Sequence, residues 1–290
     1  MDIFKLRENR TTAGREVTAG VVTFMAMAYI IFVNPKILAA AMGDDLVPAL
    51  AVATCIGAGL LSILMGLIGN YPLALASGMG LNAFLAYGVV IGMKVPWQTA
   101  MGVVFIEGAI ITVLVLTHIR EQVMNAIPLD LKRGIGVGIG LLIALIGLQN
   151  GRLVVGDPAT MITFAKPGPE SLVAVFGLVL TAALMVKKVR GAFLIGILLS
   201  TAAAVAAGLV RLPPSPVSGL NPEHFKTFFA LDIAGALRLG LLGTIFAFLI
   251  TDFFDTMGSI VAVGEQAGFM DAEGRVPRLK RILLVDSLGA

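Results

Sequence analysis

Two carboxylates lie inside an apolar stretch that is long enough to cross a lipid bilayer. The stretch runs from Leu239 to Val263 and contains Asp252 and Asp255. A transmembrane helix needs about 20 predominantly apolar residues, and a charge near the bilayer centre costs about 3 kcal/mol on insertion scales. Such residues therefore face a protein interior or a water-filled path. On a helix, Asp252, Asp255 and Ser259 share one stripe, so the sequence predicts one narrow, polar and buried face here.

The composition indicates an integral membrane protein. Of the 290 residues, 58% are hydrophobic and only 13% are charged, whereas soluble domains contain about 25% charged residues. The basic residues stand in short clusters between apolar runs, so they indicate membrane topology and not nucleic-acid binding. The single cysteine, Cys55, excludes an intramolecular disulfide. No Cys/His cluster suggests a metal site, and we expect neither a metal nor an organic cofactor.

The apolar runs predict an all-α polytopic membrane protein with about eight segments at membrane depth. We expect these segments at Val17–Val33, Ala49–Gly69, Leu73–Met93, Gln98–Thr117, Gly134–Leu148, Ser171–Val186, Ala192–Val210 and Leu239–Val263. A ninth segment begins at Ile282, and the sequence stops at Ala290. About nine residues cannot cross a bilayer, so we expect a C-terminally truncated chain.

The distribution of basic residues predicts the orientation. With the amino terminus in the cytoplasm, the segments on that side hold 14 of the 21 Lys and Arg residues. This excess fits the positive-inside rule and a multi-pass protein of the cell membrane. Residues 211–238 contain four prolines and cannot cross. Phe225, Phe228 and Phe229 in this loop predict a short helix lying on the outer membrane surface.

The third segment is predicted to be part extended. Pro72, Ser77, Gly78 and Gly80 all weaken a helix, and irregular backbone at membrane depth is tolerated only where it is buried or lines a cavity. Unpaired N–H and C=O groups between Leu73 and Gly80 would then bind a planar, hydrogen-bonding solute. The alternative, which the residues alone leave equally open, is that glycine and serine allow close helix packing.

Further polar side chains lie at membrane depth. Asn82 follows the broken segment and offers both a hydrogen-bond donor and an acceptor. Glu107, in the fourth segment, is either a member of a proton relay or an acid bonded to a neighbouring helix. Asp252 could likewise support a neighbouring helix, whereas Asp255 is the acid for which we expect a functional role.

Four motifs in order resemble one transporter family. They are Gly14–Pro35, the Gly-Met-Gly-Leu-Asn-Ala-Phe run ending at Phe84, the Asp-Phe-Phe-Asp-Thr-Met-Gly run beginning at Asp252, and Asp286–Ala290. Together they resemble the adenine/guanine/hypoxanthine permeases, a branch of the xanthine/uracil permease superfamily of nucleobase/cation symporters. The resemblance covers the chain from about Asp2 onward.

The resemblance implies a uracil-permease-like fold of two inverted seven-span repeats, divided into a substrate-carrying core and a gate. Applied to this chain, it implies five regions. They are a cytoplasmic amino terminus (1–16), core spans one to four (17–117), gate spans five to seven (118–210), an external loop (211–238), and core span eight with the start of span nine (239–290). The tenth span of the family, which completes its site, would follow Ala290.

The resemblance also implies a purine site. Asn82 and Asp255 match residues that bind the purine, and Ser259 matches a ligand-facing polar position. Gly78, Gly80 and Phe84 of the third-span motif complete the expected substrate-binding set. Asp255, Asp252 and Glu107 are the expected proton-coupling acids.

The expected function is import of guanine, hypoxanthine or adenine with a proton, by elevator-like alternating access. H⁺ is the expected coupling ion, with Na⁺ as the alternative. Purine and membrane lipid are the expected partners, nucleic acid is not, and a homodimer is left open. A sulfate or bicarbonate carrier of the same architecture is a rival that the two aspartates oppose. An intramembrane enzyme is not expected, because no nucleophile and base are paired. A non-transporting fragment is the third alternative.

Overall fold

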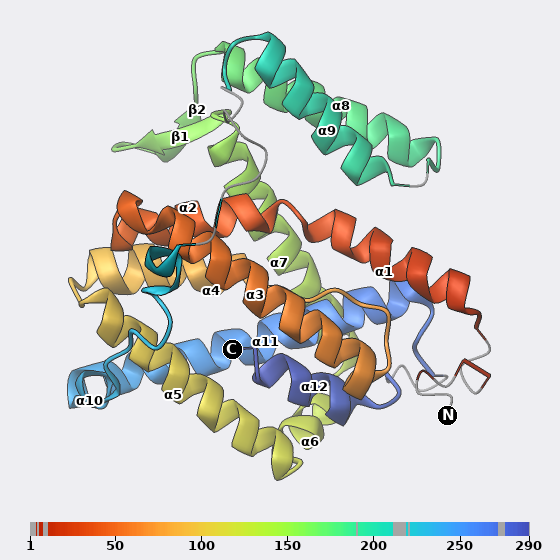
Figure 1. Cartoon of the computed structure of the whole chain (residues 1–290), viewed down its shortest axis with the longest axis vertical. Coiled ribbons are helices and arrows are strands. Elements are labelled where there is room, and N and C mark those ends of the chain that lie inside the picture. Colours follow the sequence, from red (N-terminus) through yellow and green to blue (C-terminus); the bar gives the residue numbers. More distant parts are fainter. Residues whose placement is uncertain are drawn as a thin grey trace. The chain divides into compact units, whose positions relative to one another are not determined.

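The computed structural model describes residues 4, 6–7, 11–189, 191–210, 219, 221–271 and 276–289, and most of them are helical (Figure 1). The chain divides into two compact units. One comprises Met1–Ile139 with Asn221–Ala290, and the other comprises Gly140–Leu220. The candidate site residues all belong to the first unit, since they lie between Gly78 and Glu107 or between Asp252 and Ser259.

The first predicted segment is two helices, α1 (Ala13–Met27) and α2 (Ile30–Met42). The Thr12 hydroxyl accepts the Arg15 N–H and so caps α1. The predicted end of this segment at Val33 is too early, because α2 continues through Pro35 to Met42. The two helices are separated at residues 28–29. There the hydrogen bonds join residues three positions apart, as from Ile31 N–H to Ala28 C=O, and they tighten the turn.

The third predicted segment is broken, as its glycines and proline indicate. It follows η1 (Asp44–Leu46), α3 (Val47–Leu64) and a π-helical turn, η2 (Met65–Gly69). Asn70 then adopts a left-handed conformation with φ of 59°, and residues 70–78 form no helix. Helix resumes at α4 (Met79–Ala83) and continues as the π-helical η3 (Phe84–Gly92). The non-helical part ends two residues earlier than predicted, at Gly78, because Gly80 lies inside α4.

Helix α5 (Trp97–Leu116) contacts several other elements of the first unit. The other elements of this unit are α6 (Ile119–Ala126), the beginning of α7 (Leu129–Asn150), η4 (Pro222–Phe225), α10 (Ile233–Ala236), η5 (Leu239–Leu241), α11 (Leu242–Ala267) and α12 (Leu279–Ser287). Helix α5 packs against α10, α11 and α12 (Figure 1). Its buried side chains include Val103, Glu107, Ile111 and Val115, and their helical spacing places them on one face.

The second unit contains a β-hairpin that the prediction of an all-α chain did not include. Strands β1 (Val154–Asp157) and β2 (Met161–Phe164) pair antiparallel. The Asp157 carboxylate closes the turn by accepting the N–H groups of Ala159 and Thr160, a local bond pattern that competes with helix. Helices α8 (Pro169–Val186) and α9 (Ala192–Ala206) pack side by side. Their contact is close because Gly177 lies opposite Ser200, and Gly196 lies opposite Thr181.

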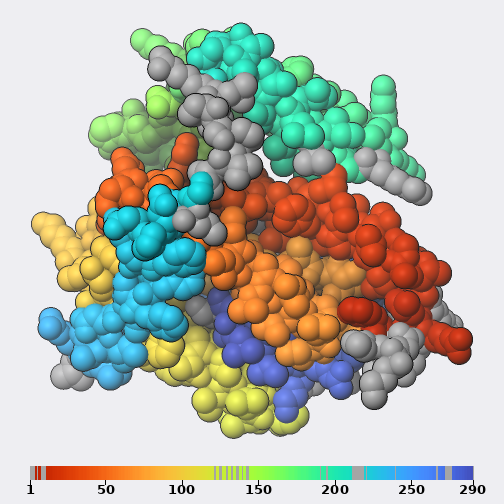
Figure 2. Space-filling model, in the orientation of Figure 1, coloured from red at the N-terminus to blue at the C-terminus, as the bar shows by residue number. Residues whose placement is uncertain are grey.

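The helices identify a multi-pass membrane protein. Within the described residues, five helical stretches are long and apolar enough to span a bilayer. Large apolar side chains cover the outer faces of α1 and α3, where Phe24 is 51% exposed and Leu60 is 57% exposed. In Figure 2, α3 separates α1 from α12, and these outer faces form much of the visible surface. Water-soluble proteins rarely expose so much contiguous apolar surface, whereas lipid tails cover it readily.

Some predictions are not decided by the structure. The count of eight segments and the inverted repeat remain predictions, as does the position of the amino terminus. The external loop contains a short 3-10 helix at Pro222–Phe225, and the Phe225 and Phe228 rings lie 5.7 Å apart. Pro213, Pro214, Pro216 and Ala290 lie outside the described residues.

Candidate functional site

Side-chain hydroxyls hold the first part of the extended segment. Thr23 of α1 accepts the Ala74 N–H at 3.1 Å, and its hydroxyl lies 3.0 Å from the Gly20 carbonyl and 3.4 Å from the Pro72 carbonyl, either of which can accept its proton. Ser62 of α3 accepts the Leu75 N–H at 2.9 Å and donates to the Leu75 carbonyl at 3.3 Å. These bonds replace the partners that a helix or sheet would supply. The first half of the segment is therefore fixed in place.

In the last part of the extended segment, several main-chain N–H groups make no hydrogen bond to the described residues. The N–H groups of Ala76, Ser77 and Gly78 have no hydrogen-bond partner among the residues that the structure describes. These three residues are each partly buried. Partly buried N–H groups at membrane depth need a partner from water or from a bound molecule. This run of donors is the first component of the candidate site.

The Asp255 side chain lies against this run. A Cβ atom added at Gly78 would stand only 3.1 Å from Asp255 Oδ2, so the carboxylate directly faces the Gly78 backbone. The Asp255 carboxylate makes no hydrogen bond or ion pair within the described part of the chain. The side chain is partly buried. An acceptor without a partner thus stands beside donors without partners.

Asn82 holds the same region together from the other side. Its side-chain Nδ2 donates to Ser77 Oγ at 3.0 Å and to Oδ1 of Asn34, a buried residue of α2. Asn34 in turn donates to Thr54 Oγ1 of α3 at 3.0 Å. With the amide oriented in this way, Asn82 Oδ1 has no partner among the described residues. Asn82 therefore positions Ser77 and retains one acceptor.

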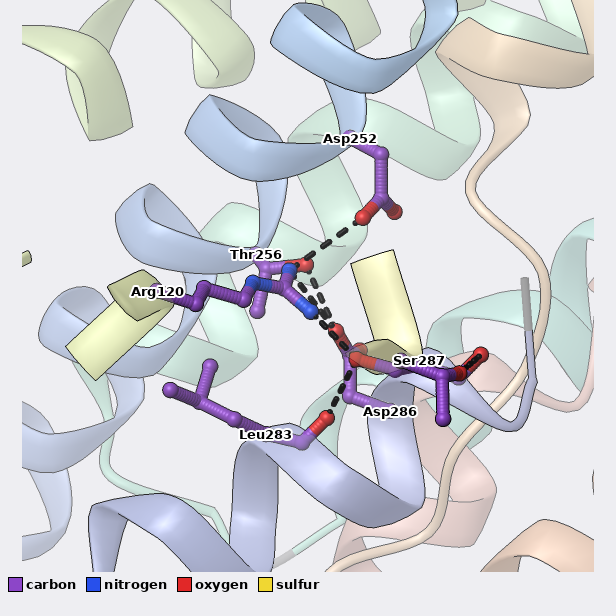
Figure 3. Close-up of polar contacts among 7 residues, drawn as sticks. Arg120, Asp252, Thr256, Leu283, Asp286 and Ser287 are labelled. Carbon is purple, nitrogen blue, oxygen red and sulfur yellow. Dashed lines mark hydrogen bonds and ion pairs between the residues drawn. The ribbon is translucent and has the colours of Figure 1, made fainter. Parts of the chain in front are cut away.

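The second acid of the predicted stripe has a different environment. Asp252 Oδ2 forms an ion pair with Arg120 Nη2 at 3.2 Å, and the same nitrogen lies 3.3 Å from Asp286 Oδ2 (Figure 3). Arg120 Nη1 donates to Ser287 Oγ at 2.6 Å, and Thr256 donates to Asp286 at 2.7 Å. We call Arg120, Asp252, Thr256, Asp286 and Ser287 the Arg120 cluster. It joins α6, α11 and α12.

Sequence reasoning missed this cluster. Arg120 stands among residues that were counted as cytoplasmic charges, and nothing in its immediate neighbours marks it as buried. Its complete burial is a tertiary outcome. Asp286 was noted only as part of a motif. A buried acid at membrane depth normally pairs with a cation. Asp252 alone could therefore have predicted that a basic residue is buried beside it.

The other predicted residues are divided between buried and exposed positions. Ser259 is exposed, so the predicted polar stripe is buried only in part, and Asp252 and Asp255 face different neighbours. Gly80 lies in the first turn of α4. Phe84 is 37% exposed, and its ring lies 4.9 Å from that of Phe248. Glu107 is 1% exposed, and its Oε1 has no hydrogen-bond partner among the described residues.

A cavity of about 410 Å³ lies on the opposite end of the extended segment. It is lined by α1, α2, α3 and residues 71–74, including Phe24, Cys55 and Leu73, and none of its lining residues is charged. Neither Asn82 nor Asp255 contributes to it. The Asp255 region, and not this apolar cavity, combines the polar groups that would select a polar solute. The described residues contain no group of three His, Cys, Asp or Glu side chains that could hold a metal.

Comparison with known proteins identifies the kind of molecule. The chain is 44% identical over 287 residues to the putative permease MJ0326 of Methanocaldococcus jannaschii, covering 99% of this chain and 65% of the relative. It is 38% identical to the adenine permease AdeP of Escherichia coli (99% and 64%). It is 41% identical to the guanine/hypoxanthine permease PbuG of Bacillus subtilis (98% and 66%).

These three relatives are permeases and not enzymes, and the chain spans about two thirds of each one's length. The sequence profile of a permease family, the xanthine/uracil permeases, matches residues 14–290. That match extends over nearly the whole chain and includes the extended segment, Asp255 and the Arg120 cluster. The chain belongs to the xanthine/uracil permease family.

Proposed function

We propose that this chain binds a purine nucleobase and moves it into the cell together with a proton. One observation supports this above all. The Asp255 carboxylate has no partner among the described residues, and it faces the extended segment whose Ala76, Ser77 and Gly78 N–H groups have none either. The names of the relatives AdeP and PbuG specify adenine and guanine/hypoxanthine permeases, which agrees with a ligand of this chemistry.

A purine would satisfy both sets of groups at once. A ring N–H group would donate to a carboxyl oxygen of Asp255, which still accepts after Asp255 has taken up its proton, and the ring nitrogens or carbonyl oxygen would accept from the main chain at Ala76–Gly78. Asn82 Oδ1 adds an acceptor for an exocyclic or ring N–H group. Unpaired polar groups of this kind discriminate strongly, because a ligand that cannot pair with them leaves them buried without partners. We propose that Gly78 is small so that the ring can approach the backbone.

Proton coupling follows from the same geometry. A partly buried carboxylate without a cation costs more free energy than the neutral acid. We propose that Asp255 takes up a proton with the substrate and releases it on the cytoplasmic side, so that no uncompensated charge crosses the hydrophobic barrier. Asp252 and Glu107 are the other two acids that we expect to take part in proton coupling, and Glu107, whose Oε1 has no partner among the described residues, is the better placed of the two to hold a second proton.

The transport step would be a movement of the substrate-carrying part against a gate. In this proposal, α1 to α5 and α11 carry the site, and the substrate alternates between the two sides of the cell membrane. An anion carrier of similar architecture is the competing function. The unpaired carboxylate at Asp255 would repel sulfate or bicarbonate, which favours the purine.

Uptake by cells tests the function directly. Bacteria that lack their own purine uptake would express residues 1–290 and receive tritiated hypoxanthine at mildly acidic external pH. We expect accumulation that a protonophore abolishes and that unlabelled guanine or adenine, but not sulfate, inhibits. Cells with an empty vector are the control. No accumulation above that control, or inhibition by sulfate, would contradict the proposal.

A further inference from the structure

Arg120 is an unusual residue to find completely buried. It lies in the first turn of α6, directly after α5 ends, and none of its surface is exposed to solvent. Its guanidinium reaches α11 through Asp252 and reaches α12 through Asp286 and Ser287 (Figure 3). The ring of Phe253, which follows Asp252 on α11, lies 6.0 Å from its Cζ. One side chain therefore fixes two helices that are more than 130 residues away in the chain.

The shape of the contact requires arginine. Nη2 lies between the two carboxylates, at 3.2 Å from Asp252 and 3.3 Å from Asp286, while Nη1 bonds to Ser287. A planar guanidinium supplies these divergent donors in a fixed fork, whereas a lysine ammonium is a single compact charge. The acceptors are themselves held: Thr256 donates to Asp286, and Ser287 donates to the Leu283 carbonyl. The cluster is thus rigid on both sides of Arg120.

The cluster is next to the candidate site but is not part of it. Asp252 precedes Asp255 by three residues on α11, which on a helix is a rotation of about 60° between the two side chains. Asp252 faces Arg120, and Asp255 faces Gly78. No bond joins Arg120 to Asp255, Asn82 or the extended segment within the described residues. The ion pair with Asp252 links Arg120 to Asp255 through the backbone of α11.

We propose that Arg120 is a positioning residue of the purine site: by pairing with Asp252 and tying α11 to α12, it sets the rotation of α11 that directs Asp255 at the extended segment. Its charge also lies beside Asp252, so that of Asp252 and Asp255 only Asp255 has no cation among the described residues. This inference rests on the function proposed above. It assigns to α6 a role in substrate affinity, although α6 does not touch the substrate.

The first test replaces Arg120 by Lys, which keeps the charge and removes the fork. We expect KM for hypoxanthine uptake to rise about tenfold, the effect of one lost charge-assisted hydrogen bond on alignment, with Vmax per molecule of membrane protein changing less than about twofold. A purely structural arginine would instead lower the amount of protein and leave KM unchanged. Unchanged KM would overturn the inference. Arg133→Lys, at the exposed ion pair between Arg133 and Glu265, is the matched control.

A second variant covers the case in which Arg120→Lys does not reach the membrane. The double variant Arg120→Gln with Asp252→Asn removes the buried cation together with one of its two acids, so its interior carries less unpaired charge than Arg120→Gln alone. We expect more protein than for the single variant and a KM that stays raised, because α11 is no longer tied. A wild-type KM in the double variant would overturn the inference. A wild-type protein without purine uptake would overturn the proposed function itself.

Discussion

Asp252 and Asp255 are the same residue type, three positions apart on one helix, yet the fold gives them opposite environments. Asp252 is 7% exposed and paired with Arg120. Asp255 is partly buried, has no ion pair among the described residues and faces the Gly78 backbone. Two carboxylates on one helix can therefore differ in whether they have a cation, and the residue across the helix interface decides this.

Removing the cation from the paired acid should have the largest effect on stability. Arg120→Gln leaves Asp252 and Asp286 buried with no cation, and we expect a loss of about 3–5 kcal/mol in the free energy of unfolding. Detergent-solubilised protein would be followed by thermal melting, together with the amount recovered from membranes. Arg133→Gln, which breaks the exposed pair with Glu265, should melt like the wild type. Equal melting of the two variants would show that Arg120 is not a structural tie.

The two acids should differ when each is neutralised. Asp252→Asn loses a charge-assisted hydrogen bond to Arg120, and we expect a loss of about 1.5–3 kcal/mol. Asp255→Asn removes a carboxylate that has no partner to lose, so the change should stay within about 0.5 kcal/mol or be stabilising. Chemical denaturation of both variants in the same detergent measures the difference. If Asp255→Asn were the more destabilising of the two variants, Asp255 and not Asp252 would be the acid that stabilises the fold.

The contact between Gly78 and Asp255 can be tested with one methyl group. Gly78 has φ of −69° and ψ of 116°, which alanine also adopts, so Gly78→Ala changes only the space beside Asp255 Oδ2. We expect the carboxylate to shift and KM for purine uptake to rise roughly tenfold. In the control, Gly57→Ala on α3, the added Cβ meets nothing within 4 Å. Equal KM values for the two variants would mean that Gly78 does not border the bound purine.

A third carboxylate, Asp232, lies outside the helices that are long and apolar enough to span a bilayer, and it provides the smallest predicted effect. Asp232 accepts the Gly235 N–H at 2.8 Å and the Thr99 hydroxyl at 3.0 Å, and these bonds hold its pKa below the usual value. The stability it contributes is therefore present at neutral pH and is lost as the pH falls through its lowered pKa. Asp232→Asn should melt slightly below the wild type at neutral pH and should equal it in acid. A difference that grows in acid would contradict this role.

The sequence predicted the parts of the site that depend on local backbone chemistry. Pro72, Ser77 and Gly78 break the third segment where expected, and the length of the apolar runs identified the membrane class. Asp255 could be named because an acid at membrane depth needs a reason to be there. The resemblance to the permease family supplied the pairing of Asp255 with the third segment, which spacing alone does not give.

The features of the fold and of the candidate site that were not predicted depend mostly on contacts between residues far apart in the sequence. Nothing near Arg120 shows that it will be buried against Asp252 and Asp286, because both partners are more than 130 positions away. The first segment was predicted to end at Val33, before Pro35, yet α2 continues through the proline to Met42. The hairpin at Val154–Phe164 was missed because two four-residue strands give too short an alternating pattern to be recognised.

The central claim is that Asp255 contacts the purine while Asp252 does not. The most direct measurement is the dissociation constant of tritiated hypoxanthine for purified wild-type, Asp255→Asn and Asp252→Asn proteins of matched folded fraction. The account predicts that binding weakens at least about tenfold in Asp255→Asn, because the amide replaces one side-chain oxygen by an NH2 group and cannot take up the proton that accompanies the purine, and weakens less in Asp252→Asn. Wild-type affinity in folded Asp255→Asn would contradict the account.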